Sequence, residues 1–191
     1  MTGRVWLIPL IVLFGQGGRS YAAEQAEPTA CAIVSAADAE KLVGAPLEVK
    51  EFAKLPTANG PGTYNSICTY IAKGGDFADA FPAARLLDLT LHFLDTSEAM
   101  AAIYENSVAQ YAEAIKSPEA PVKNATITPL SGFGDKAFVL EAVTDKTTGY
   151  KSALIVFYKG RVGGSIAAWK KPDSALETTK TVLKFILSKL P

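Results

Sequence analysis

The clearest periodic signal in the chain is an alternation of apolar and polar residues near its centre. Leucine or phenylalanine occupies every second position from 87 to 93, and the positions between them hold Asp88, Thr90 and His92. Successive side chains of a β-strand point to opposite faces of the sheet. The pattern therefore predicts a strand with one buried face and one more polar face.

Helical spacing predicts three helices. Apolar residues recur at steps of three and four from Met100 to Ile115, after two candidate caps, Asp95 and Thr96. A second such stripe ends at Leu190 and follows the candidate cap Asp173. A shorter helix is predicted at 36–43, because Ser35 and Asp38 form the pattern of a capping box and Gly44 ends the segment.

The remaining extended segments predict further strands at 47–52, 64–72, 122–130, 137–143, 150–158 and 161–169, with a two-residue turn at Lys159 and Gly160. Short turns favour antiparallel pairing. The predicted fold class is α+β: a mainly antiparallel sheet of six to seven strands, flanked by two long helices and one short N-terminal helix. A repeat of four residue identities at an offset of 86 favours a pseudo-symmetric sheet.

The first 22 residues have the pattern of a signal peptide. Arg4 precedes a ten-residue apolar run, and Ser20 and Ala22 provide the small residues of a cleavage site after Ala22. The alternative is an uncleaved anchor. Cleavage predicts an exported protein of the periplasm or extracellular space, with no stable membrane span, a flexible leader at 23–30 and a single domain at 31–191.

The chain contains two cysteines, Cys31 and Cys68. In an oxidising compartment, an even pair most simply forms one disulfide. Two alternatives remain open. The first is a pair of buried free thiols, and the second is a lipid-modified Cys31, although this residue lies far beyond the apolar run.

Charge and composition exclude several classes of partner. Nineteen basic residues balance nineteen acidic ones, which argues against binding to nucleic acid. A single histidine and two cysteines leave little material for a metal centre, and no cofactor is expected.

No catalytic constellation emerges from the sequence, and the protein is predicted not to be an enzyme. His92 shares a strand face with Thr90 and Asp88, but side chains on one face project in parallel about 7 Å apart. Cys68 as a nucleophile conflicts with the disulfide. The segment from Gly132 to Ala137 has the spacing of a dinucleotide-binding loop, but β-forming residues follow it where that loop requires a helix.

Aromatic residues offer the best candidate for ligand binding. Tyr70, Tyr158 and Trp169 lie on predicted strands, where rings lining a concave sheet would suit a small amphipathic molecule. The alternative is that these rings belong to an ordinary core.

Four segments together resemble small exported bacterial domains of unknown function that are often actinobacterial lipoproteins. They are 31–44, the Cys68-Thr69-Tyr70 run, 132–137 and the Lys159-Gly160 turn. The resemblance implies a Cys31–Cys68 disulfide and a PsbP-like α+β fold, and it supplies no catalytic residues. The lipidation motif of these proteins is absent. We expect a non-enzymatic envelope protein that binds a small molecule or another exported protein. The alternatives are an accessory subunit of an envelope complex and a cryptic hydrolase.

Overall fold

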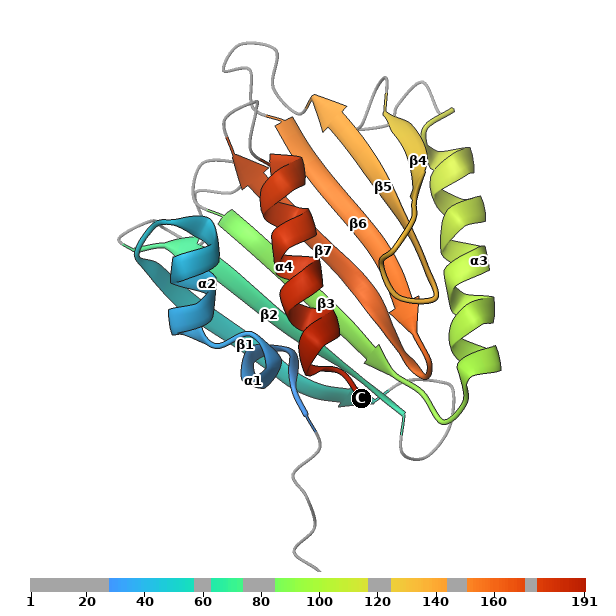
Figure 1. The fold of residues 1–191 in the computed structure, drawn as a ribbon, viewed down its shortest axis with the longest axis horizontal. Helices are drawn as coiled ribbons and strands as arrows, with labels where there is room; N and C mark the ends of the chain where they lie inside the picture. The colour runs from blue at the N-terminus through green and yellow to red at the C-terminus, as the bar shows by residue number, and fades with distance from the viewer. Residues whose placement is uncertain (1–27, 57–62, 74–84, 117–124, 144–150, 171–174) are drawn as a thin grey trace, which may run out of the picture.

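A computed structural model describes residues 28–56, 63–73, 85–116, 125–143, 151–170 and 175–191, and shows an α+β fold (Figure 1). The helices are α1 (Ala30–Ile33), α2 (Ala36–Val43), α3 (Ser97–Ala114) and α4 (Ala175–Lys189). The strands are β1 (Leu47–Pro56), β2 (Tyr64–Ala72), β3 (Arg85–Phe93), β4 (Thr126–Leu130), β5 (Lys136–Val143), β6 (Lys151–Lys159) and β7 (Val162–Lys170). They form one seven-stranded antiparallel sheet in the order β1-β2-β3-β7-β6-β5-β4.

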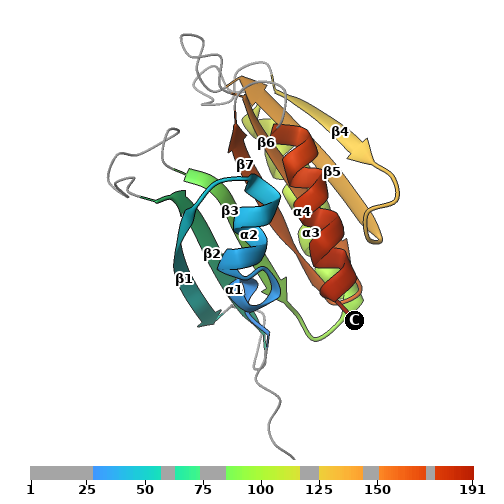
Figure 2. The ribbon, with the colours of Figure 1, turned by 60° about the vertical axis from the view of Figure 1, so that its left-hand side comes forward.

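Helices cover both faces of this sheet. Figure 2 shows α1, α2 and α4 on one face, which we call the α4 face, and α3 behind the sheet on the other, the α3 face. The alternation predicted for β3 orients it: Leu87, Leu89 and Leu91 have no exposed surface and belong to the core on the α4 face. Along β6, Ile155 belongs to the same core, whereas its neighbour Val156 packs with α3.

The predicted helix signals are confirmed where the structure describes them. Ser35 and Asp38 form a capping box at the start of α2, and Gly44 ends that helix in a left-handed conformation with φ of 77°. Thr96 rather than Asp95 caps α3, because its side chain accepts a hydrogen bond from the backbone N–H of Ala99. Asp173 lies outside the described residues.

Several element boundaries differ from those predicted. The hairpin turn between β6 and β7 consists of Gly160 and Arg161, one residue later than predicted, with Gly160 at a φ of 55°. Helix α1 begins at Ala30, which is fully buried. β1 continues to Pro56, four residues beyond the predicted strand, with a shift of register after Phe52.

The glycine pattern at 132–137 forms a turn and not a nucleotide-binding loop. Gly132 and Gly134 both have positive φ and connect β4 to β5, and no helix follows them.

The strand register places two matching serines of the repeat at an offset of 86, Ser66 and Ser152, on opposite faces of the sheet. It puts Ser66 on the α4 face with Cys68, whereas Ser152 lies next to Ala153, which occupies that face in β6.

Candidate functional site

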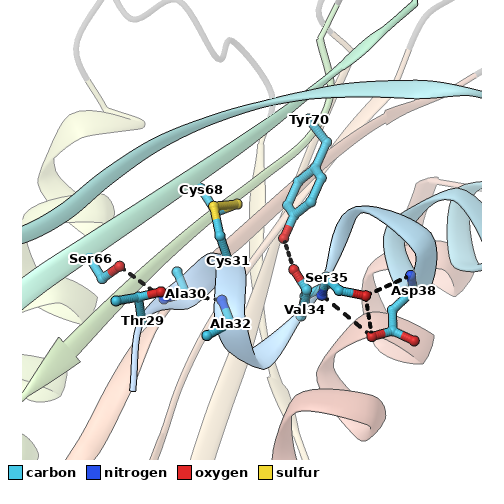
Figure 3. The surroundings of a disulfide bond; sticks show 10 residues. All are labelled: Thr29, Ala30, Cys31, Ala32, Val34, Ser35, Asp38, Ser66, Cys68 and Tyr70. Atoms are coloured by element: carbon cyan, nitrogen blue, oxygen red, sulfur yellow. Dashed lines mark hydrogen bonds between the residues drawn. A yellow bond between two sulfur atoms is a disulfide. The ribbon is translucent and has the colours of Figure 1, made fainter. Parts of the chain in front are cut away.

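The predicted disulfide between Cys31 and Cys68 is present, and it ties α1 to β2 (Figure 3). Two hydrogen bonds hold the same segment. The backbone N–H of Ala30 donates to Ser66 Oγ at 2.8 Å, and the Tyr64 hydroxyl donates to the Pro28 carbonyl at 2.8 Å. This corner of the molecule anchors the beginning of the domain.

Tyr70 lies in the same corner, on the α4 face. Its side chain is fully buried, and its hydroxyl donates a hydrogen bond to the carbonyl of Val34 (Figure 3). Burial raises the pKa of the Tyr70 hydroxyl, so the group stays protonated and keeps donating. Tyr70 therefore acts as a packing residue that supports the turn between α1 and α2.

Tyr158 lies on the opposite face from Tyr70. Its ring packs against Tyr104 of α3, with the ring centroids 5.3 Å apart. Trp169 is placed in β7 opposite Ser152, but its side chain lies outside the described part of the structure. The sheet thus separates Tyr70 from Tyr158, and these two rings do not line one common pocket.

A different cavity is present between α3 and the sheet. It has a volume of about 110 Å³. Its described walls come from α3, β3, β6 and β7, and consist of Met100, Ile103, Tyr104, Ser107, Tyr111, His92, Val156, Phe157, Gly164 and Ser165. The α3 residues among them recur at helical spacing. This spacing predicted which side of the helix is buried, but it did not predict a cavity beneath that side.

The described lining of this cavity is neutral. None of the residues named is an acid, a lysine or an arginine. Burial raises the pKa of the Tyr104 and Tyr111 hydroxyls, so both phenols stay protonated. The hydroxyl of Ser107 donates to the Ile103 carbonyl at 2.9 Å. The cavity therefore combines aromatic surface with uncharged polar groups.

His92 contributes a ring to the wall of this cavity, and Asn65 holds it in place. The distance from His92 Nδ1 to Asn65 Oδ1 is 2.6 Å. Since an amide oxygen only accepts hydrogen bonds, Nδ1 carries the proton and Nε2 is left as an acceptor in the neutral ring. Burial lowers the pKa of His92, which favours that neutral form. No local sequence pattern singles out Asn65, because its role depends on the pairing of β2 with β3.

Replacing His92 with glutamine is expected to flatten the pH dependence of stability between about pH 7.5 and pH 5. The pKa of the folded group is lowered, so the unfolded chain takes up its proton first as the pH falls. Stability contributed by neutral His92 is complete above its ordinary pKa of 6.5 and is lost as the pH falls towards the folded pKa. Urea midpoints at both pH values measure this loss.

The chain has no other histidine, so no second imidazole contributes to the pH dependence in that range. The capping carboxyl of Asp38 has a lowered pKa because Ser35 donates hydrogen bonds to it, so it titrates below the window. Equal pH dependence in the wild type and His92→Gln would contradict the prediction.

Two further hollows lie elsewhere on the surface. One of about 200 Å³, near the C-terminus, includes Arg161 and Lys189, and an open groove of about 530 Å³ runs between α3 and the β4–β5 turn. Neither combines a histidine with tyrosines among its described residues. In the parts of the chain that the structure describes, no acidic, histidine or cysteine side chains gather as a metal site would require, and no helix is long and apolar enough to cross a membrane.

The predicted cleavage site after Ala22 lies outside the described residues. Comparison of the chain with models of protein families finds no match, and comparison with curated protein sequences finds no similar protein.

Proposed function

We propose that the protein is an exported, non-enzymatic binding protein, and that it holds a small neutral molecule in the cavity beneath α3. The observation that carries the proposal is the composition of that cavity: ring-bearing residues, namely His92, Tyr104, Tyr111 and Phe157, with no charged side chain among its described walls. Binding sites for small molecules typically combine apolar walls with a few polar groups that fix orientation.

Cavity size limits the ligand. An apolar protein cavity of about 150 Å³ binds benzene. The cavity beneath α3 is somewhat smaller, at about 110 Å³. It therefore suits a single ring or a short chain, with any larger part of the ligand outside. A charged ligand would lose its hydration without gaining an opposite charge, so a neutral one is favoured.

Binding is favoured over catalysis because the cavity has no activated nucleophile. Catalytic serines are normally hydrogen-bonded to a base. Within the described chain, no hydrogen bond joins His92 to Ser107 or Ser165, and the Ser107 hydroxyl is engaged by a backbone carbonyl. The unprotonated Nε2 of His92 can instead accept a hydrogen bond from a donor group of the ligand.

Export is part of the proposal, and it rests on the signal-peptide pattern at 1–22 together with the disulfide. The likeness to PsbP-like exported domains, with two long helices flanking a pseudo-symmetric sheet, also remains a proposal. The second candidate function, an accessory subunit of an envelope complex, has the support of three exposed large hydrophobic side chains on β1.

Phenol is a suitable probe, because it joins one ring to one hydrogen-bond donor. We expect phenol to bind at millimolar concentration or tighter, observed as shifts of cavity residues in NMR spectra of the exported chain. Ser107→Leu, which fills the cavity, should weaken binding at least about tenfold. Ala102→Leu is the matched control, because this α3 residue is exposed and does not line the cavity.

Three results would contradict the proposal: no response to phenol, equal binding by Ser107→Leu, or binding of benzoate as tight as that of phenol. The last result would show that charge is tolerated. Unchanged binding in Ala102→Leu is required for the comparison, because it shows that a larger side chain on α3 does not disturb the site by itself.

A further inference from the structure

His92 has a different neighbour on each side within the sheet. Its strand, β3, runs between β2 and β7 (Figure 1). The register puts His92 directly opposite Asn65 on β2 and directly opposite Gly163 on β7. Side chains directly opposite one another on one face of an antiparallel pair are close enough to interact. The imidazole therefore has a polar partner on the β2 side and a residue without a side chain on the β7 side.

The hydrogen bond to Asn65 fixes the orientation of the imidazole ring. In this ring, Nδ1 and Cδ2 are attached to opposite sides of Cγ, and Nε2 is bonded to Cδ2. Because Nδ1 lies 2.6 Å from Asn65 Oδ1, the edge that carries Cδ2 and Nε2 is turned away from β2. The cavity has walls on that side, from β7 and α3. The nitrogen turned towards the cavity is thus Nε2, which carries no proton while Nδ1 donates to Asn65.

Within the described chain, no group of the protein donates to Nε2. The Met100 thioether occupies the space above Gly163, because a Cβ built on that glycine would lie 2.5 Å from Met100 Sδ. A thioether has no proton to donate. Serine and tyrosine hydroxyls also belong to the cavity walls, but none of those described forms a hydrogen bond with Nε2. An O–H or N–H group of a ligand can donate to this nitrogen.

An acceptor of this kind makes a cavity selective. A ligand without a donor would displace water from Nε2 and leave the nitrogen without a hydrogen bond, which is unfavourable. Sites that form a hydrogen bond with one polar group of a ligand strongly reject analogues that lack the group. An entirely apolar cavity would have the opposite preference, and would favour the more hydrophobic of two rings of equal size.

We propose that Asn65 determines the ligand specificity of the cavity: by holding His92 with its proton on Nδ1, it restricts the site to small neutral rings that carry a hydrogen-bond donor. Asn65 is a positioning residue, because it acts through His92 and is not one of the cavity walls. The inference rests on the proposed function and narrows its class of ligand. Burial lowers the pKa of His92, which keeps the acceptor available at neutral pH.

Two measurements on the wild-type exported chain test this inference. Nitrogen NMR distinguishes protonated from unprotonated imidazole nitrogens, and the single histidine gives an unambiguous spectrum. At about pH 8, where imidazole and phenol are both neutral, we expect the proton on Nδ1. Toluene matches phenol in size but has no hydrogen-bond donor. It should therefore bind at least about fivefold more weakly than phenol.

Substitution of Asn65 tests its positioning role. Asn65→Leu removes the acceptor, so the ring can carry its proton on Nε2. This variant should lose the preference for phenol while binding toluene within about twofold of the wild type. Asn65→Asp is the matched control, because it keeps an acceptor oxygen and should keep both the Nδ1 proton and the preference. It is measured above the pKa of its imidazole, which the carboxylate raises.

A proton on Nε2 in the wild type, or equal binding of phenol and toluene, would overturn the inference. Neither result depends on a variant that folds. Equal binding that Ser107→Leu weakens for both molecules would leave the proposed binding function in place. A preference for phenol that persists in Asn65→Leu, or a loss of affinity for both molecules alike, would overturn the role of Asn65. If neither molecule binds, the proposed function fails, and this inference fails with it.

Discussion

Removing the Cys31–Cys68 disulfide is expected to lower the free energy of unfolding by about 4 kcal/mol. The two cysteines are 37 residues apart, and their bond restricts the unfolded chain over that loop. In the folded protein, the segment keeps its other attachments, including the bond from Ala30 to Ser66. The expected loss therefore arises mainly in the unfolded state. It is a large share of the free energy of unfolding of a typical domain, which is roughly 5–15 kcal/mol.

Urea denaturation of the Cys31→Ala/Cys68→Ala variant measures this loss. Alanine is preferred to serine because Cys68 is fully buried, and a hydroxyl there would need a partner. Reductant should destabilise the wild type by a similar amount and leave the variant unchanged, which provides the internal control. A variant within about 1 kcal/mol of the wild type would contradict the entropic account.

The second large effect is expected for Gly164→Ala. Gly164 lies in β7 opposite Leu91 of β3. A Cβ atom built on Gly164 would lie 1.9 Å from the backbone oxygen of Thr90. Backbone atoms in the middle of a sheet cannot move aside as a flexible side chain can. This contact is also where β1, β2 and β3 join the other four strands. We expect a loss of about 3 kcal/mol or more, or failure to fold.

Two control variants give Gly164→Ala a definite interpretation. Ser165→Ala changes the adjacent residue and adds no atom. Gly132→Ala adds a Cβ where no atom lies within 4 Å, at a φ of 80°, and should cost only about 1 kcal/mol of backbone strain. Soluble yield and circular dichroism report on folding, and urea midpoints report on stability. A midpoint for Gly164→Ala equal to that of Gly132→Ala would contradict the predicted clash.

Local patterns in the sequence predicted much of the secondary structure. The alternation around His92 identified β3, and the spacing between Ser35 and Asp38 identified the capping box of α2. These features depend on interactions within a few residues, so the local sequence specifies them. The disulfide was predicted on different grounds, because only two cysteines are present and the signal-peptide pattern predicts an oxidising compartment.

The candidate site was less accessible to such reasoning. Alternation shows that the residues of one strand divide between two faces, but it does not relate the faces of different strands. Tyr70 and Tyr158 both fit a ring-lined sheet by composition, yet the register puts them on opposite sides, since a shift of one residue exchanges the faces of a strand. The link between Asn65 and His92 depends on the same kind of register.

The sequence by itself determined the positions of most helices and strands, the antiparallel hairpins and the pair of cysteines that could bond. These are set by local periodicity, capping and turn chemistry. Only the tertiary structure decided that β3 lies beside β7, that α3 and α4 cover opposite faces, and that a neutral cavity lies beneath α3. An amphipathic helix carries information that one side must be buried, but which sheet face buries it depends on how all the elements pack together.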